Sequence, residues 1–153
     1  MSIPYLKVKP EKAISVLEEY IVKGYRLMTP VNNEYFGMKE RKEWGDNSST
    51  LEAIQKWRMW LSDWTNECES NLFEIFVSAR EVYNFGDAKP PFGVTSEDVR
   101  FTSVLDQLRA KITCLNKYTE FIFEQFNVKF SVKAGRDAVV QTGNNPVSEI
   151  KNG

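Results

Sequence analysis

The residue types that most often carry out catalysis are largely missing from this chain. It contains no histidine, which excludes Ser-His-Asp and Cys-His catalysis and every zinc motif that includes histidine. The commonest general base near neutral pH and the Glu-x-x-His pairs of di-iron helical bundles are excluded for the same reason. Cys68 and Cys114 are the only cysteines, too few for a four-cysteine zinc site. Because both lie in helical apolar patterns, we expect two buried thiols in a reducing compartment.

Carboxylates are the remaining candidates for catalysis or metal binding. Asp63 and Glu67 are four residues apart, and Glu74 lies further along the same side of an expected helix. Such a face could bind a hard cation or transfer protons, as in a Mg²⁺-dependent hydrolase or nuclease. Nothing in the sequence indicates apolar burial around these groups, so a solvated helix face is the favoured interpretation. We therefore expect a protein that is not an enzyme and needs no cofactor or metal.

Aromatic and cationic side chains are mixed between positions 35 and 44. This mixture suits stacking on a base or on a side chain of a partner, and it also suits a loop that is anchored by its aromatics. Near the C-terminus, Lys129, Lys133 and Arg136 give a modest positive charge that could contact an anionic ligand. The candidate ligand- or partner-binding residues are Tyr35, Phe36, Arg41, Trp44, Trp60 and Arg136.

The expected helices carry more large apolar side chains than a three-helix bundle would bury. Trp57, Trp60 and Trp64 share one side of a helix, and core packing is the favoured interpretation for them. Trp60 nevertheless widens the apolar face, and Phe121 and Phe123 do the same on a later helix. This excess favours self-association or a protein partner.

These side chains are positioned by three expected helices, of which the first runs from about Pro10 to Met28. Proline suits the first turn, and apolar residues repeat at helical spacing behind it. Thr29-Pro30 is expected to end this helix, because proline blocks its continuation. The stretch from Val31 to Ser48 then reads as irregular, with most of it facing water.

The second and third helices are expected to be long and to run antiparallel to each other. The second opens at Ser49, with Glu52 completing a capping box, and extends to about Ser78. A loop from Val82 to Thr95 follows, and the third helix runs from Thr95 or Ser96 to near Asn127. The apolar stripe of the second helix is expected to be Leu51, Ile54, Trp57 or Arg58, Leu61, Trp64, Cys68, Leu72 and Ile75. Tyr83, Phe85 and Phe92 are expected to pin the loop, with Asp98 as the capping partner of Thr95.

The last segment changes from a helical to an alternating pattern. Val128, Phe130 and Val132 alternate with polar residues, and a turn separates them from a second apolar run at 138–142. The expected organisation is a helical domain over 1–127 and a β-hairpin tail over 128–153. Three roles stay open for the tail: it packs on the helices, it pairs with another copy as an oligomerisation element, or it stays mobile. The predicted fold is therefore mainly α: a long antiparallel helical hairpin, a shorter N-terminal helix and a small C-terminal β-hairpin.

Charge and hydropathy narrow the expected partners. Acidic and basic residues nearly cancel, at 21 against 20, which argues against generic nucleic-acid binding. No apolar run approaches the length of about 20 residues that spans a membrane, and the N-terminus lacks a signal-peptide pattern. We expect a cytoplasmic protein with no membrane contact.

Two stretches resemble parts of bacterial anti-phage defence proteins. The run from Lys56-Trp57-Arg58 to Leu72-Phe73-Glu74-Ile75-Phe76, with the long helix after it, resembles helical modules found beside effector domains. The tail from Ala134-Gly135-Arg136-Asp137 to Asn145 is similar to short Gly-Arg-Asp strand motifs that follow such modules. Together they cover about residues 50 to 145. The resemblance implies a partner, adaptor or inhibitor in conflict between phages and bacteria, and it identifies no functional residue.

The favoured hypothesis is a non-catalytic, self-associating interaction protein. The alternative is a protein that captures a small anionic or nucleotide-like molecule, between subunits or beneath the 35–44 segment.

Overall fold

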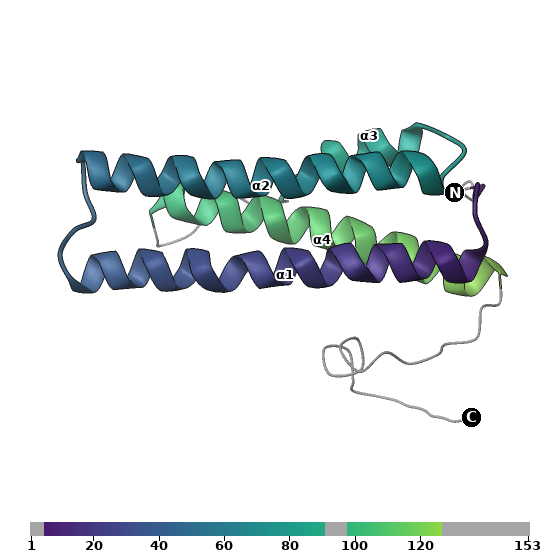
Figure 1. The fold of residues 1–153 in the computed structure, drawn as a ribbon, viewed down its shortest axis with the longest axis horizontal. Coiled ribbons are helices and arrows are strands. Elements are labelled where there is room, and N and C mark those ends of the chain that lie inside the picture. The colour runs from purple at the N-terminus through teal and green to yellow at the C-terminus, as the bar shows by residue number, and fades with distance from the viewer. Residues whose placement is uncertain (1–4, 91–97, 127–153) are drawn as a thin grey trace, which may run out of the picture.

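The computed structural model describes residues 5–90 and 98–126 of the chain. Over these residues the fold consists of four helices: α1 (Pro10–Glu40), α2 (Ser48–Ile75), α3 (Arg80–Gly86) and α4 (Val99–Phe126). The three long helices pack side by side along the length of the molecule (Figure 1). The expectation of a mainly α protein is confirmed.

Helix α1 does not end at Met28, as expected, but continues through Pro30 to Glu40. Pro30 lies on the exposed side of the helix, so the carbonyl that it leaves unpaired can face water. Beyond it, Val31, Tyr35 and Met38 continue the buried stripe. Proline costs a helix interior about 3 kcal/mol, and burial of three large side chains at about 1.5–3 kcal/mol each exceeds that cost. The N-terminal helix is therefore one of the long helices rather than the short one.

Helix α1 ends in a Schellman motif at the start of the 41–47 connection. The Glu43 N–H donates to the Met38 carbonyl at 2.7 Å, and the Lys42 N–H donates to the Lys39 carbonyl at 3.0 Å. Lys42 takes the left-handed conformation, with φ of 61°, which this motif requires. The chain is thereby turned toward α2.

Helix α2 is capped by Asn47 rather than by Ser49. The Asn47 side chain accepts a hydrogen bond from the Thr50 N–H at 2.8 Å, which satisfies a donor of the first turn. Leu51 is exposed and does not belong to the buried stripe. The rest of the expected stripe is confirmed as buried: Ile54, Trp57, Leu61, Trp64, Cys68, Leu72 and Ile75.

The expected loop after α2 contains the short helix α3. Phe85 is fully buried and Tyr83 is exposed, so only the former pins this segment, while Phe92 lies outside the described residues. Helix α4 begins at Val99 and not at Thr95 or Ser96. Asp98 caps it directly, because its side chain accepts a hydrogen bond from the Arg100 N–H at 2.8 Å.

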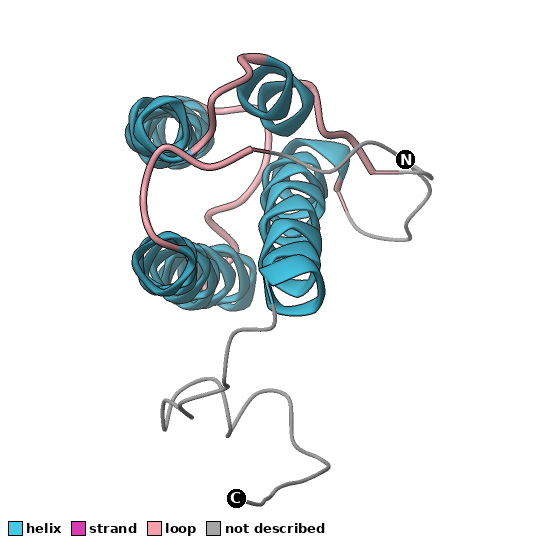
Figure 2. Ribbon diagram, turned by 90° about the vertical axis from the view of Figure 1, so that its right-hand side faces the viewer, coloured by secondary structure: helices cyan, strands magenta, loops and turns pink. Residues whose placement is uncertain are grey.

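The long helices are arranged as an antiparallel hairpin of α1 and α2 with α4 packed against both. Tyr35 near the end of α1 stacks on Phe101 at the start of α4, so these two helices are antiparallel. Trp57 near the start of α2 also contacts Phe101, and Phe76 just after α2 contacts Tyr118 near the end of α4. Helices α2 and α4 are therefore parallel, and their expected antiparallel pairing was wrong. The segment with α3 gives the chain enough length to return along the bundle before α4 starts (Figures 1 and 2).

The three long helices come close together at Gly24. A Cβ atom at this position would lie 2.8 Å from Trp64 Cζ2 and 3.0 Å from Ile112 Cδ1. The Trp64 ring is held in place there, since its indole N–H donates to the Tyr20 carbonyl at 3.0 Å. Glycine is thus the residue that lets α1 approach both neighbours.

The expected β-hairpin lies outside the described residues, so the division at residue 127 stays a prediction. Within the described residues, extended pairing is limited to an antiparallel bridge between Leu6 and Phe76. The Lys7 N–H donates to the Ile75 carbonyl at 2.7 Å, and the Val77 N–H donates to the Tyr5 carbonyl at 2.9 Å. This bridge ties the start of the chain to the end of α2.

Candidate functional site

An aromatic cluster closes one end of the bundle, which we call the turn end. It comprises the end of α1, the 41–47 connection and the first turns of α2 and α4. Tyr35 and Phe101 stack with ring centroids 3.7 Å apart and planes inclined by 4°. Trp44 stacks on Trp57 at 5.7 Å and meets the edge of Tyr35 at 4.9 Å. Offset and edge contacts of this kind add stability beyond the area that they bury.

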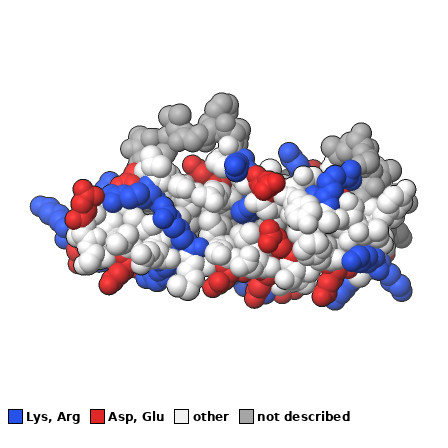
Figure 3. All heavy atoms as spheres, turned by 90° about the horizontal axis from the view of Figure 1, so that it is seen from above, with Lys and Arg blue, Asp and Glu red and all other residues white. Residues whose placement is uncertain are grey.

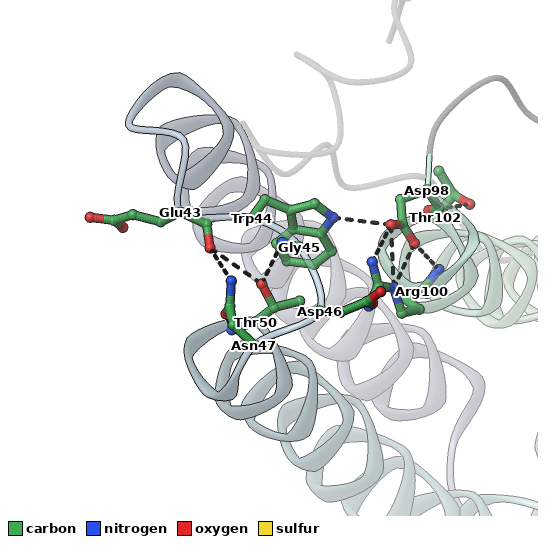
Figure 4. A network of polar contacts seen from close by, with 9 residues as sticks. All are labelled: Glu43, Trp44, Gly45, Asp46, Asn47, Thr50, Asp98, Arg100 and Thr102. Atoms are coloured by element: carbon green, nitrogen blue, oxygen red, sulfur yellow. Dashed lines mark hydrogen bonds and ion pairs between the residues drawn. The ribbon is translucent and has the colours of Figure 1, made fainter.

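A polar network fastens this cluster to the start of α4 (Figure 4). The Trp44 indole N–H donates to Asp98 Oδ2 at 3.0 Å, and Arg100 Nη2 donates to the same oxygen at 2.7 Å. Arg100 also pairs with Asp46 at 3.4 Å, and its guanidinium lies 5.3 Å from the Trp44 ring centroid. The Arg100 guanidinium, with help from the Trp44 N–H, holds the pKa of Asp98 well below its usual range.

Glu34 forms a second polar contact beside the cluster. The Trp57 indole N–H donates to Glu34 Oε1 at 2.8 Å, and the Lys56 ammonium donates to Oε2 at 2.8 Å. Burial acts to raise the pKa of Glu34, but these two hydrogen bonds outweigh it and the pKa is lowered. A buried tryptophan N–H therefore finds an ionised acceptor, as its burial requires.

The structure brings together only part of the expected binding residues. Tyr35 is buried and Trp44 half-buried within the cluster, and Phe36 lies at its edge with half of its surface exposed. Arg41 turns away and pairs with Glu43 at 3.0 Å. Trp60 lies elsewhere on α2, half-buried beneath the Lys56 ammonium. Arg136 lies outside the described residues.

A small ligand was expected either between subunits or beneath the 35–44 segment. Beneath that segment lie the rings of the cluster, and a cleft of about 550 Å³ lies beside them, between the 45–48 backbone, α2 and α4. Leu51 and Ile54 form its apolar wall, and Arg58 and Arg100 supply its cationic groups. Within the described residues Arg58 makes no hydrogen bond or ion pair, whereas Arg100 is engaged by Asp98 and Asp46. Sequence reasoning missed Arg58, because it stands beside Trp57 in the stripe and carries no motif.

The outward face of α2 is the other feature that sequence reasoning missed. Helix α2 occupies a corner of the bundle, so one of its sides has no neighbouring helix (Figure 2). Leu51, Met59 and Phe73 on this side are 55%, 60% and 43% exposed. Between them Gln55, Ser62 and Asn66 are exposed and uncharged, and the line that they form is bordered by the exposed Arg58 and the half-buried Glu69. We call this set the outward stripe: Leu51, Gln55, Met59, Ser62, Asn66 and Phe73.

The surplus aromatics that suggested self-association lie elsewhere. Trp60, Phe121 and Phe123 are all half-buried, and Trp60 and Phe123 pack against the core. The bundle therefore absorbs most of the excess that the sequence indicated. Several large apolar side chains stay exposed on the described residues, and three of them, Leu51, Met59 and Phe73, lie along one side of α2.

The described residues offer no arrangement suited to metal catalysis. Asp63, Glu67 and Glu74 are all exposed, and no group of three acidic or cysteine side chains in the described part of the chain could hold a metal ion. Lys111 is buried, and burial lowers its pKa, but its ammonium donates to the Phe85 and Gly86 carbonyls at 3.3 and 2.7 Å. It thereby caps the end of α3, which is a structural role.

Comparison with protein families, with curated proteins and with solved structures finds no match to this chain. Over the residues that the structure describes, no helix combines the length and the apolar character needed to cross a membrane. Three features of the described residues therefore bear on function: the turn end, its cleft and the outward stripe.

Proposed function

We propose that this chain is a non-catalytic interaction protein that binds another protein through the outward stripe of α2. The observation that carries the proposal is a line of exposed residues on a long helix, with the large apolar side chains of Leu51, Met59 and Phe73 spread along it. Burying Leu51, Met59 and Phe73 against a partner would contribute several kcal/mol at about 25 cal/mol per Å² of apolar area. Patches of this type, rimmed by charged residues, are typical of protein-interaction sites.

The charges around the stripe support a protein partner rather than a nucleic acid. On the side of the molecule that carries α2 and α3, cationic and anionic side chains are interspersed (Figure 3). A nucleic-acid interface would need a concentration of cations along one face. The near-neutral balance of 20 basic and 21 acidic residues agrees with this interpretation.

The resemblance to helical modules of anti-phage proteins suggests in which biological process the partner is found. We propose that the partner belongs to a conflict between phages and bacteria and that the interaction takes place in the cytoplasm. The chain would act there as an adaptor or as an inhibitor. Proteins from such systems are the first candidates to present to the outward stripe.

Site-specific photocrosslinking tests the proposal directly. A photoreactive phenylalanine at Met59 projects from the stripe, whereas the same residue at Ser15 lies on an exposed part of α1. In cells that express the chain, we expect a discrete covalent adduct from position 59 and none from position 15. No adduct from position 59, or equal adducts from both positions, would contradict the proposal.

A second candidate function is supported by the cleft at the turn end. Its cationic groups, its apolar wall and the first backbone N–H groups of α2 suit a small molecule with an anionic and an apolar part. Arg58 is the cation there that has no ion pair within the described residues. The ligand proposed here is the anionic or nucleotide-like molecule of the alternative hypothesis, and its proposed binding place is the observed cleft.

Thermal stability in the presence of anions tests the second candidate. A ligand that binds the folded state raises the melting temperature by mass action, so we expect a shift with millimolar inorganic phosphate or a nucleotide. The shift should disappear in Arg58→Gln and persist in Arg26→Gln, which removes an exposed arginine from α1. An equal shift in both variants would indicate non-specific anion binding and would remove this candidate.

A further inference from the structure

We infer that residues 128–132 of this chain pair as a β-strand with the edge of Leu6 that faces away from Phe76, and so cover this end of the bundle. The inference goes beyond the proposed function, since it does not depend on what binds the outward stripe. It is drawn from the backbone geometry of the bridge, from the register of α1 against α4, and from two segments with the same alternation of apolar and polar residues.

The backbone of Leu6 has a second edge, which we call the open edge. The two hydrogen bonds that form the bridge flank the pair of Leu6 and Phe76 rather than joining its members. In an antiparallel pair of this kind, the N–H and C=O groups of both residues point away from the partner strand. The Phe76 N–H accordingly donates to the Leu72 carbonyl at 2.9 Å. Within the described residues, the N–H and C=O groups of Leu6 make no hydrogen bond.

The last residue of α4 lies beside the first residue of α1. Tyr35 stacks on Phe101, and the close contact of α1 with α4 halfway along follows the same antiparallel register. Pro10 lies 25 residues before Tyr35, and Phe126 lies 25 residues after Phe101, so this register brings Phe126 level with Pro10. Leu6 precedes Pro10 by only four residues, a span of about 14 Å at most. The chain therefore leaves α4 close to the segment that leads into α1 (Figure 1).

Residues 5–9 and 128–132 carry the same alternating pattern. In the structure the odd positions of 5–9 are exposed, and the even ones, Leu6 and Val8, pack partly buried against the core. In 128–132 the even positions are apolar and the odd ones are lysine and serine. Neighbouring strands turn alternate residues to the same face of a sheet. The apolar side chains of 128–132 can therefore cover the surface that Leu6 and Val8 leave exposed, while the polar ones face water.

The occupant of the open edge is a segment of this chain because that segment is already tethered nearby. Helix α4 ends at Phe126, whose side chain is 39% exposed, and residues 127–153 follow it in the sequence. A strand tethered at this distance meets the edge at a high effective concentration. It also adds a third strand to a two-stranded contact, which is marginal by itself.

Amide hydrogen exchange of the full chain, followed residue by residue by NMR, tests the inference. We expect the Leu6 N–H to exchange at least about tenfold more slowly than an unprotected amide, because a strand on the open edge gives it an acceptor. The Lys7 N–H, which donates to the Ile75 carbonyl at 2.7 Å, is the internal reference for the bridge itself. A Leu6 N–H that exchanges at the unprotected rate, beside a protected Lys7 N–H, would overturn the inference.

Two substitutions of equal charge identify the segment that protects Leu6. Phe130→Asp places a carboxylate on the apolar face of the segment and should return the Leu6 N–H to the unprotected rate, with Lys7 unchanged. Ser131→Asp places the same charge on the opposite face and should leave Leu6 protected. Protection that survives Phe130→Asp, or that both variants remove equally, contradicts pairing of 128–132 in this orientation.

The dependence on protein concentration separates the chain's own segment from that of a second copy. A strand from the same chain protects Leu6 equally at every concentration. Protection that appears only at high concentration and is lost on dilution would show that the strand comes from another copy, and would overturn the inference. Neither result bears on the outward stripe, which shares no residue with 5–9 or 128–132, so the proposed function is tested separately.

Discussion

Asp98 joins two parts of the turn end, the start of α4 and the 41–47 connection, through one carboxylate. It caps α4, accepts the Trp44 N–H, and pairs with Arg100. Its side chain is only 24% exposed, so solvent screens these contacts less than it screens a surface pair. Because charge-assisted hydrogen bonds stabilise the ionised form, the pKa of Asp98 is depressed and its ionisation is linked to folding.

We expect Asp98→Asn to lower the free energy of unfolding by about 1–2 kcal/mol at pH 7, since hydrogen bonds to charged groups contribute on this order. A group with a depressed folded-state pKa stabilises the protein fully above its unfolded pKa, about 3.9 for aspartate. That contribution is lost as the pH falls through the folded-state pKa. In urea unfolding curves, the difference between the parent and the variant should therefore shrink steadily below about pH 4.

Glu19→Gln provides the control for this experiment. Glu19 pairs with Lys23 at 3.0 Å across one turn of α1, with both side chains about half exposed, and exposed pairs of that kind contribute at most a few tenths of a kcal/mol. A difference between the parent and Asp98→Asn that stays constant from pH 7 to pH 2 would show that the carboxylate charge is not what stabilises the turn end.

The capping residues illustrate how far single positions could be predicted. The sequence contains capping patterns at Ser49 and at Thr95, and both placed the helix start wrongly. The observed caps, Asn47 and Asp98, are equally good capping residues that lie two and three positions away. Local chemistry predicts that a cap occurs in each region, but several residues compete for it. Which one caps depends on the tertiary contacts of the turn end.

At the scale of the element, the length of α1 was the largest difference from expectation. Pro30 was expected to end the helix, yet the apolar spacing continues beyond it through Val31, Tyr35 and Met38. That spacing is visible in the sequence, but the prediction gave more weight to the general rule that proline ends a helix. The rule describes a local cost, and burial of three large side chains exceeds that cost.

We expect Pro30→Ala to stabilise the protein by about 1–3 kcal/mol, because alanine restores a backbone donor and has the best helix propensity. The side chain at this position is exposed, so no core contact is lost. Thermal unfolding should show a higher midpoint for Pro30→Ala than for the parent. A lower midpoint would mean that a bend at Pro30 is needed to seat Tyr35 against Phe101.

At Gly24, in the same helix, packing in the core opposes the substitution that helix propensity favours. Alanine would be favoured over glycine by about 1 kcal/mol in an exposed helix, but its Cβ would collide with the Trp64 ring and Ile112. The ring has little freedom to move, since its N–H is bonded to Tyr20. Overpacking of a core costs about 1–3 kcal/mol, so we expect Gly24→Ala to destabilise the protein and Gly24→Val to do so more strongly.

Gly37→Ala is a matched control on α1. A Cβ there would meet only the flexible end of the Arg41 side chain, at 3.1 Å. We expect it to leave the unfolding midpoint unchanged or to raise it, by up to about 1 kcal/mol in stability. If both glycine substitutions move the midpoint in the same direction, the close approach at Gly24 is not the determining factor.

At the scale of the whole molecule, periodicity predicted which faces are apolar but not how the helices are paired. The buried stripe of α2 was predicted almost correctly, but the direction of α2 relative to α4 was not. A stripe records that a face is covered, without recording the direction of the helix that covers it. Direction follows from the connection, and a segment long enough to return along the bundle allows parallel α2 and α4.

Because periodicity does not give the arrangement of the helices, it also did not predict where the candidate binding surface lies. The aromatic residues of the 35–44 segment were expected to form a binding surface, but continuation of α1 places Tyr35 in the core. Met59 and Phe73, two of the apolar residues that stay exposed, are hard to recognise in the sequence because they fall outside the dominant stripe. Only the placement of α2 at a corner of the bundle identifies them as a common face.

Two surfaces compete to explain self-association: the outward stripe of α2 and the segment after residue 127. The core contacts of α1, α2 and α4 described above involve residues 5–126, so a chain that ends at Asn127 should keep its helical circular dichroism signal. If the stripe forms the contact, that shortened chain should still show twice its own mass in light scattering. In the shortened chain, Ser62→Arg would place a charge within the stripe and should therefore lower the measured mass to that of a single chain. A shortened chain that is folded but single would assign self-association to the C-terminal segment, as the sequence pattern first indicated, and would leave the outward stripe for a different protein.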